Sequence, residues 1–249
     1  MPWYPDDPYQ CGPQSLATVL TASGVEMAPE SLVASIYVPE RRGSFAPELK
    51  ASARAHGRLP YRLAPTLDAL MTALDDGYPV LILQNLGLGF APTWHFAVVV
   101  GYDRDAGAFL LRSGPHRRLV MDSTRFERRW RLGDYWGIAL LGPADLPDWV
   151  ELTGYEAQLA YLETAWGPHL EGVYRRMAKR WPQSATANLG LGNLAFGSAD
   201  LAGAERYYRR VLAADGDHVG ALNNLAEVYA RRGQLEAALK LACRALRLA

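Results

Sequence analysis

The stretch Tyr9-Gln10-Cys11-Gly12-Pro13-Gln14-Ser15-Leu16 places a cysteine where a helix is expected to begin. Residues 11–23 predict that helix, because Pro13 suits a first turn, an apolar stripe follows, and Gly24 provides a stop. The amides and the dipole at a helix N-terminus stabilise a thiolate relative to a thiol. Cys11 is therefore a candidate nucleophile, and a buried structural cysteine is the alternative interpretation.

The same helix end is suited to hold a second charged species. Amides that stabilise a thiolate also stabilise the oxyanion that forms when a carbonyl group is attacked. Gln10 precedes the cysteine directly, and its side-chain amide is a candidate additional donor. Removing one such donor in other enzymes costs about 3 kcal/mol of transition-state stabilisation.

A thiolate nucleophile needs a histidine, and the position of each histidine separates the candidates. His95 opens the β-branched run Trp94–Tyr102, which predicts a central strand and hence a rigid mount. His56 precedes a glycine at a helix end, whereas His169 and His218 lie in a helical region. We expect His95 to act as general base and acid, with a partly buried structural histidine as the alternative.

The strand that begins at His95 is followed by a turn at 103–107 and a second strand at 108–112. Folding this hairpin about Asp105 brings residues 113–115 opposite His95. The residue expected to accept the imidazole N–H is therefore Ser113. A serine hydroxyl stabilises an imidazolium less than a carboxylate does, which weakens the predicted triad.

Three other side chains are candidates for the third member of the site. Asp103 lies eight residues along the strand from His95, roughly 26 Å at the usual strand rise. It is therefore too far away to orient the imidazole. Asp122 and Asn85 remain alternatives to Ser113.

The chain changes its pattern once. Helix-like and strand-like segments alternate up to about Gly142, whereas only helical periodicity remains from about Gly154. The intervening residues are rich in Pro, Gly and Asp, as linkers are. We expect an α+β domain at 1–142, a linker at 143–153 and an all-α domain at 154–249.

The helical part repeats with a period of 34 residues. Ala187 then matches Ala221, and small residues recur where paired helices must approach closely. The pattern resembles the tetratricopeptide repeat, with copies at 187–216 and 221–249 and a degenerate copy at 155–182. Two interpretations of this region are open. It is either a surface that binds a peptide or partner protein, or an appendage that stabilises or dimerises the chain. Cys243 is expected to be a small core residue in the last helix.

Composition excludes several classes of protein. Twenty-six basic residues balance twenty-six acidic ones among 249, so no global field favours nucleic acid or an anionic membrane. No apolar run is long enough to span a bilayer, and the residues before Cys11 are too few and too polar for a signal peptide. Metal-site and nucleotide-binding spacings are also missing, so neither a metal nor another cofactor is expected.

Two further segments have open interpretations. The apolar stretch 86–94, just before His95, predicts either a mobile lid with apolar substrate subsites or an ordinary buried loop. The basic residues at 117–118 and 128–131 fit a solvated face or a guide for an acidic peptide.

Taken together, the motifs resemble the papain-like peptidases of the bacteriocin-processing, double-glycine type. The resemblance covers about residues 1–142 and rests on the segments 9–13, 76–82, 95–102 and 126–141. It implies an α+β papain-like fold, Cys11 as nucleophile, His95 as base and acid, and Gln10 in the oxyanion hole. The aspartate of the family falls on Ser113. Many relatives are fused to an exporter, which nothing in this chain supplies, so their substrate does not carry over.

The sequence therefore predicts a cysteine peptidase that hydrolyses a peptide or protein substrate. Alternatives are a catalytically weak module that binds a peptide or partner protein, and a transferase or isopeptidase with the same dyad. Stand-alone relatives with a repeat tail resemble exported bacterial proteins. Because this chain begins just upstream of the cysteine motif, we expect a periplasmic or cell-envelope location, with a cytosolic protein as the alternative.

Overall fold

The computed structural model describes residues 1–4, 10–41 and 43–249; Tyr9 of the cysteine motif lies outside these ranges. Contacts divide the chain into two compact units, Met1–Ala165 and Trp166–Ala249. Helix α6, Leu152–Leu159, packs on strand β1 of the first unit, so this division falls later than the expected linker. The domain limits predicted from the sequence, 1–142 and 154–249 with a linker at 143–153, stay a prediction. Across the described ranges, no helix combines the length and hydropathy needed to cross a membrane.

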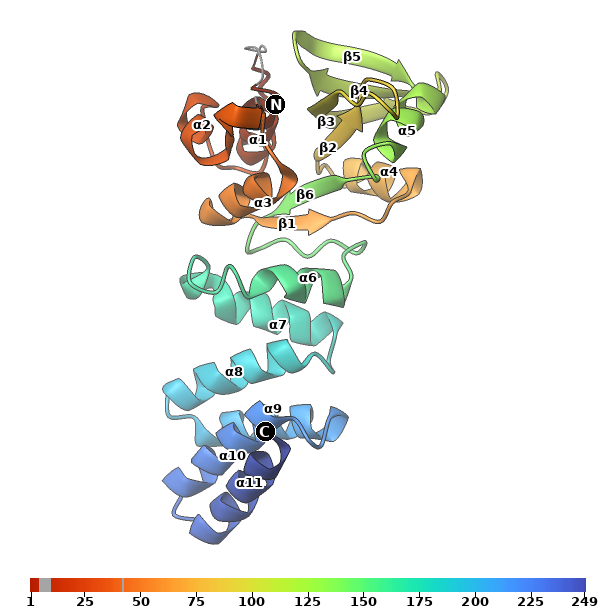
Figure 1. Ribbon diagram of the computed structural model, residues 1–249. Helices are drawn as coiled ribbons and strands as arrows, with labels where there is room; N and C mark the ends of the chain where they lie inside the picture. The colour runs from red at the N-terminus through yellow and green to blue at the C-terminus, as the bar shows by residue number, and fades with distance from the viewer. Residues whose placement is uncertain (5–9, 42) are drawn as a thin grey trace. The chain divides into compact units, whose positions relative to one another are not determined.

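The first unit contains both helices and strands (Figure 1). Its described helices are α1 (Cys11–Ala22), α2 (Glu30–Ile36), a 3-10 turn (Pro39–Arg41), α3 (Ala46–Ala55), α4 (Leu67–Asp75), α5 (Ser123–Arg131) and α6 (Leu152–Leu159). Its strands are β1 (Leu59–Arg62), β2 (Val80–Asn85), β3 (Trp94–Asp103), β4 (Ala108–Ser113), β5 (His116–Asp122) and β6 (Gly137–Leu141). The predicted helix at the cysteine and the predicted hairpin after His95 are both confirmed.

The six strands form one sheet in the order β1-β6-β2-β3-β4-β5, and every neighbouring pair is antiparallel. Strands β2 and β3 are central and read as apolar runs because both of their faces are covered. Figure 1 shows α1 to α3 on one side of the sheet and α4 and α5 on the other. Helix α1 packs mainly against β3, whereas α5 packs mainly against β2.

The core between α1 and the sheet fixes the position of the helix that carries the cysteine. Leu16 and Leu20 of α1 are fully buried and share one cluster with Phe96 and Val98 of β3. Burying a side chain of this size stabilises the fold by about 1.5–3 kcal/mol. The apolar stripe predicted on this helix therefore anchors it to the strand that begins beside His95.

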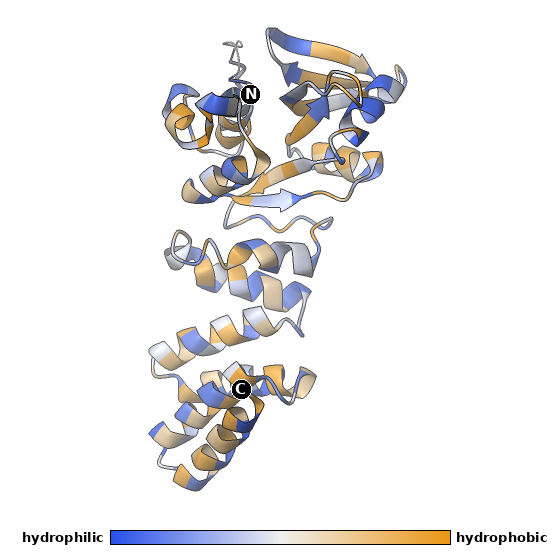
Figure 2. Ribbon diagram, in the orientation of Figure 1, coloured by the Kyte–Doolittle hydropathy of each residue, from blue (hydrophilic) through white to orange (hydrophobic). Residues whose placement is uncertain are grey.

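The second unit is helical. Its elements are a 3-10 turn (Gly167–His169), α7 (Leu170–Arg180), α8 (Ala185–Gly197), α9 (Leu201–Ala214), α10 (Val219–Arg231) and α11 (Leu235–Leu248). Figure 2 shows hydrophobic and hydrophilic residues interleaved along these helices. A Cβ on Gly192 of α8 would overlap the Tyr208 ring of α9, which confirms that a small residue is needed where these two helices approach.

One expectation about this unit is wrong. Cys243 was expected in the core of the last helix, but it is exposed on α11. The apolar residues Leu235, Leu239 and Leu246 of the same helix are also exposed. The buried positions of α11 are the alanines Ala238 and Ala245, so a small-residue stripe faces the neighbouring helix instead of the thiol.

Candidate active site

Cys11 is the first residue of α1, as its sequence context predicts. Gln10 occupies the N-cap position, but neither it nor any other side chain caps the helix, and the first turn holds no acidic residue. The positive end of the helix dipole is therefore not neutralised by a carboxylate from its own first turn. Cys11 itself is partly buried and packs against the apolar cluster beneath α1. The helix end stabilises a thiolate at Cys11, whereas packing against apolar side chains opposes one.

The residue after the cysteine must be a glycine for a steric reason. A Cβ on Gly12 would overlap the side chain of Ser44, which precedes α3. Gly12 is buried, so an added methyl group there could not turn into solvent. The close approach of this loop to the start of α1 thus depends on the missing side chain.

His95 and Ser113 lie together. The Nε2 atom of the imidazole is 2.9 Å from the Ser113 hydroxyl oxygen, a hydrogen-bond distance. Ser113 ends β4, and the two-residue turn after it uses Gly114 at a φ of 55° to enter β5. The hairpin prediction, which put residues 113–115 opposite His95, is confirmed.

The two alternatives to Ser113 are engaged elsewhere. Asp122 caps α5, where its Oδ1 atom accepts hydrogen bonds from the amides of Thr124 and Arg125. The Oδ1 atom of Asn85 accepts from the amides of Gly87 and Thr93, each at 2.9 Å. Both side chains organise local backbone, so Ser113 is the hydrogen-bond partner that the structure gives His95 among the described residues.

The surroundings of His95 favour the neutral ring. Burial and, to a smaller extent, the positive charge of Arg129 on α5 lower the pKa of His95 to about 4. Both effects act in the same direction, because desolvation and a like charge each disfavour an imidazolium. At neutral pH the ring therefore holds one proton and offers one lone pair, which is the form that accepts a proton from a thiol.

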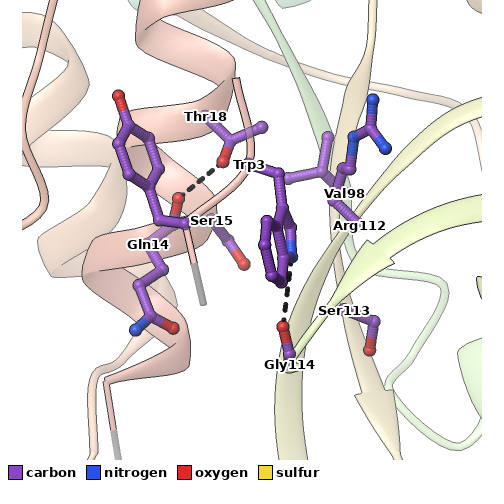
Figure 3. Close-up of a pocket in the computed structure, with 9 residues that line it drawn as sticks. Trp3, Gln14, Ser15, Thr18, Val98, Arg112, Ser113 and Gly114 are labelled. Carbon is purple, nitrogen blue, oxygen red and sulfur yellow. Dashed lines mark hydrogen bonds between the residues drawn. The ribbon is translucent and has the colours of Figure 1, made fainter. Parts of the chain in front are cut away.

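A small pocket shows which end of the sheet α1 approaches. It is lined by Gln14, Ser15 and Thr18 of α1 and, across from them, by Val98, Arg112, Ser113 and Gly114 (Figure 3). Trp3 lies between the helix and β4, and its indole N–H donates to the Gly114 carbonyl oxygen at 3.3 Å. The N-terminal half of α1, which begins with Cys11, thus lies against the end of β4 that carries Ser113.

The loop between β2 and β3 is exposed and apolar. Phe90 is 87% exposed, Leu88 is 60% exposed and Trp94 is 53% exposed. Buried Asn85 ties the two ends of the loop together through the bonds given above. The expectation of an ordinary buried loop is wrong, because the tip projects apolar side chains into solvent directly before His95. The alternative, a lid that contributes substrate subsites, stays a prediction.

Sequence reasoning missed two residues beside this site. Arg129 was read only as part of a basic surface, although it is partly buried and acts electrostatically on His95. Gln84, on β2 next to β3, is completely buried. The polar pair Gln84-Asn85 at the end of the apolar run Val80–Leu83 was the available signal for it. Metal-ligating residues do not cluster in groups of three or more anywhere in the described ranges.

Two family models match the chain. The Peptidase_C39 like family matches residues 1–133, and a tetratricopeptide repeat model matches residues 195–247. Since the first match covers more than half of the 249 residues, the chain belongs to the Peptidase_C39 like family. The resemblance drawn from the cysteine and histidine motifs is confirmed at the level of the family, and the helical repeat is confirmed for the second unit.

Comparison with solved structures finds similarity to three proteins among others. A protein from Bacillus anthracis described as C39-like is 16% identical, with 56% of this chain and 94% of that chain covered, at a TM-score of 0.47. A double glycine motif protease from an AMS/PCAT transporter, solved with its leader peptide, is 23% identical over 56% and 89% of the chains, at 0.42. The peptidase domain of Streptococcus ComA, a bifunctional ABC transporter, is 20% identical over 55% and 93%, at 0.42. No curated protein matches the chain.

Proposed function

We propose that the first unit is a cysteine peptidase in which Cys11 is the nucleophile and His95 the general base and acid. The observation that carries the proposal is the hydrogen bond between the Nε2 atom of His95 and the hydroxyl of Ser113. If Nε2 carries the proton, the lone pair of the neutral ring is on Nδ1, where it can accept the thiol proton. Membership of a peptidase family supports the same reaction class.

The reaction then follows in balanced steps. The Cys11 sulfur attacks the peptide carbonyl carbon while its proton moves to Nδ1 of His95. The oxyanion is held by amides at the start of α1 and, in this proposal, by the side-chain amide of Gln10. The imidazolium returns its proton to the leaving amine, which leaves a thioester on Cys11. Water, deprotonated by His95, attacks that thioester and breaks its carbon–sulfur bond, which releases the acid. The proton on His95 returns to the Cys11 sulfur.

The low pKa of His95 sets a condition on this scheme. Ser113 offers a hydroxyl and not a carboxylate, and Arg129 opposes a positive charge on the ring. The imidazolium is therefore a short-lived species and not the resting state of the pair. If Cys11 and His95 are both uncharged at rest, the enzyme should be slower than a cysteine peptidase that has a carboxylate as the third member of its site.

The rival function is a module that binds a peptide without cleaving it, and the hydroxyl at Ser113 is the observation that favours it. Purified wild type, Cys11→Ser and His95→Ala proteins would be incubated with peptides from a bacterial proteome, and new N-termini would be identified by mass spectrometry. The peptidase proposal expects cleavage by wild type alone. Peptides retained by all three proteins and cut by none would establish the binding module.

A transferase or isopeptidase would share the same thioester, so the products distinguish it. Cleavage in H2(18)O places the heavy isotope on the new carboxyl group when water attacks the thioester. A product in which an amine has replaced water would instead assign a transferase, and a branched starting peptide would assign an isopeptidase.

We propose that the second unit recruits a protein partner or the protein substrate. The tetratricopeptide match and the exposed Leu239 and Leu246 of α11 support an interaction surface. A Leu239→Ser/Leu246→Ser protein should then cleave a short peptide at the wild-type rate and a full-length protein substrate several-fold more slowly. Equal rates on both would leave the second unit with a stabilising role.

A periplasmic or cell-envelope location also remains a proposal. It is supported by the resemblance to exported proteins that carry a repeat tail, and the natural protein can be tested by fractionation of its bacterial cells. Recovery with a cytoplasmic marker enzyme would overturn it.

A further inference from the structure

Gln84 is an unusual residue in the centre of the sheet. It lies on β2, its exposed fraction is 0%, and neither the nitrogen nor the oxygen of its side-chain amide has a hydrogen-bond partner among the described residues. An amide buried in this way destabilises a fold, because its bonds to water are lost and not replaced. The apolar residues before it on β2 show that the position also suits a hydrophobic side chain.

The register of the sheet puts Gln84 beside the proposed base. Gln84 and His95 are direct partners in the antiparallel ladder of β2 and β3. Directly opposed residues of such a pair project to the same face of the sheet, with their Cβ atoms about 4.5–5.5 Å apart. Ser113, on the other side of β3, bonds the same ring. The imidazole is thus flanked by an amide from one strand and a hydroxyl from the next.

We propose that Gln84 is a positioning residue for His95: the dipole of its buried amide stabilises the protonated ring, together with the Ser113 hydroxyl. The catalytic consequence rests on the function proposed above, whereas the effect of Gln84 on the pKa of His95 does not. An oriented oxygen dipole stabilises an adjacent positive charge without carrying a full charge of its own. Gln84 then supplies part of the stabilisation that an aspartate at the Ser113 position would give.

The other charged groups around β3 do not compensate for the missing carboxylate. Helix α1 and strand β2 contain no charged residue. Asp75 of α4 bonds the Tyr102 hydroxyl, toward the opposite end of β3, and Arg112 lines the pocket against α1. Arg129 of α5 is the charge that lowers the pKa of His95. Gln84 is therefore well placed to offset part of that repulsion.

Two substitutions test this role in the full-length chain. Gln84→Met keeps the length of the side chain and removes its hydrogen-bonding groups, whereas Gln84→Glu places a carboxyl group there. Ser52→Ala is the matched control, because Ser52 is also buried and its hydroxyl has no partner in the described structure, but it lies on α3. Each variant is measured for thermal unfolding, for alkylation of Cys11 by iodoacetamide at pH 7, and, in a Cys11→Ser background, for the pKa of His95 by NMR.

The expected result combines a loss of reactivity with no loss of stability. Gln84→Met should unfold at the same or a higher temperature and yet alkylate Cys11 at least about five-fold more slowly. Gln84→Glu should raise the pKa of His95 by one unit or more, because a nearby negative charge favours the imidazolium. Ser52→Ala should change neither quantity.

The proposal is overturned if Gln84→Met alkylates within two-fold of wild type, or if Gln84→Glu leaves the pKa of His95 unchanged. Failure of the peptidase proposal looks different: Cys11 would then alkylate at the same rate in wild type and His95→Ala proteins. In that case the NMR pKa, which needs no thiol, decides alone whether Gln84 acts on His95.

Discussion

His95 Nε2 lies 2.9 Å from the hydroxyl oxygen of Ser113, across the hairpin that joins β3 to β4. The contact orients the imidazole through its far nitrogen and leaves Nδ1 as the ring atom available for proton transfer. It also replaces a charged third member with a neutral one. The chemistry of the site depends on what that replacement does to the charge of the ring.

Substitutions at Ser113 should affect both the reactivity of Cys11 and the pKa of His95. Ser113→Ala should lower the rate at which iodoacetamide alkylates Cys11 by roughly three- to ten-fold, because a hydrogen bond between neutral groups contributes about 0.5–1.5 kcal/mol. Ser113→Asp should raise the pKa of His95, because an adjacent carboxylate stabilises the imidazolium. NMR titration in a Cys11→Ser background measures that pKa, and an unchanged value in Ser113→Asp would refute the contact.

The lowered pKa of His95 predicts how stability depends on pH. The folded value is about 4 and the ordinary value is 6.5, so the unfolded chain binds this proton first as the pH falls. Stability contributed by the neutral ring is complete above pH 6.5 and is lost between pH 6.5 and about 4, by up to about 1.4 kcal/mol per pH unit. Urea unfolding of wild type and His95→Gln proteins measures this slope. Parallel curves over that range would contradict the assignment.

Asn85 should control the order of the exposed loop before His95. Asn85→Ala removes a buried side chain whose oxygen accepts from two backbone amides, and should cost about 2 kcal/mol of unfolding free energy. Hydrogen exchange at the amides of Gly87 and Thr93 should accelerate, since both donate to this side chain. Asn85→Asp keeps the acceptor oxygen and should protect those amides more than alanine does. Equal protection in both variants would show that the loop orders itself without this side chain.

Gly12 should be intolerant of even one added carbon. Gly12→Ala places a methyl group against Ser44 and should destabilise the first unit by about 1–3 kcal/mol, as overpacked sites do. Gly77→Ala provides a contrast, because a Cβ there meets no atom within 4 Å, although its φ of 84° adds backbone strain. A double variant Gly12→Ala/Ser44→Gly should recover most of the loss. No recovery would mean that the clash with Ser44 is not the cause.

The parts of the site that the sequence predicts are those set by local chain geometry. Cys11 at a helix start follows from the turn residues and the apolar stripe after it, and Ser113 beside His95 follows from the length of one hairpin. Both inferences need only neighbouring elements. They hold because short connections leave a strand few ways to return.

The parts that it does not predict depend on contacts between distant segments. Arg129 reaches His95 only because α5 packs on the sheet, and nothing in its basic surroundings distinguishes it from solvated arginines. Cys243 is exposed because alanines occupy the inner face of α11. The burial of Gln84 likewise follows from the layers on both sides of β2. The local pattern marks a polar residue at the end of an apolar run but does not show how deeply it is buried.

The most direct test of a Cys11–His95 pair compares the two thiols of one molecule. Residue-resolved mass spectrometry would follow alkylation of Cys11 and of exposed Cys243 by iodoacetamide at pH 7, in wild type and His95→Ala proteins. A pair of this kind predicts that Cys11, although less exposed, reacts at least about ten-fold faster than Cys243 and loses that advantage in His95→Ala. The peptidase mechanism would be contradicted if Cys11 reacted no faster than Cys243 and at the same rate in the wild type and His95→Ala proteins.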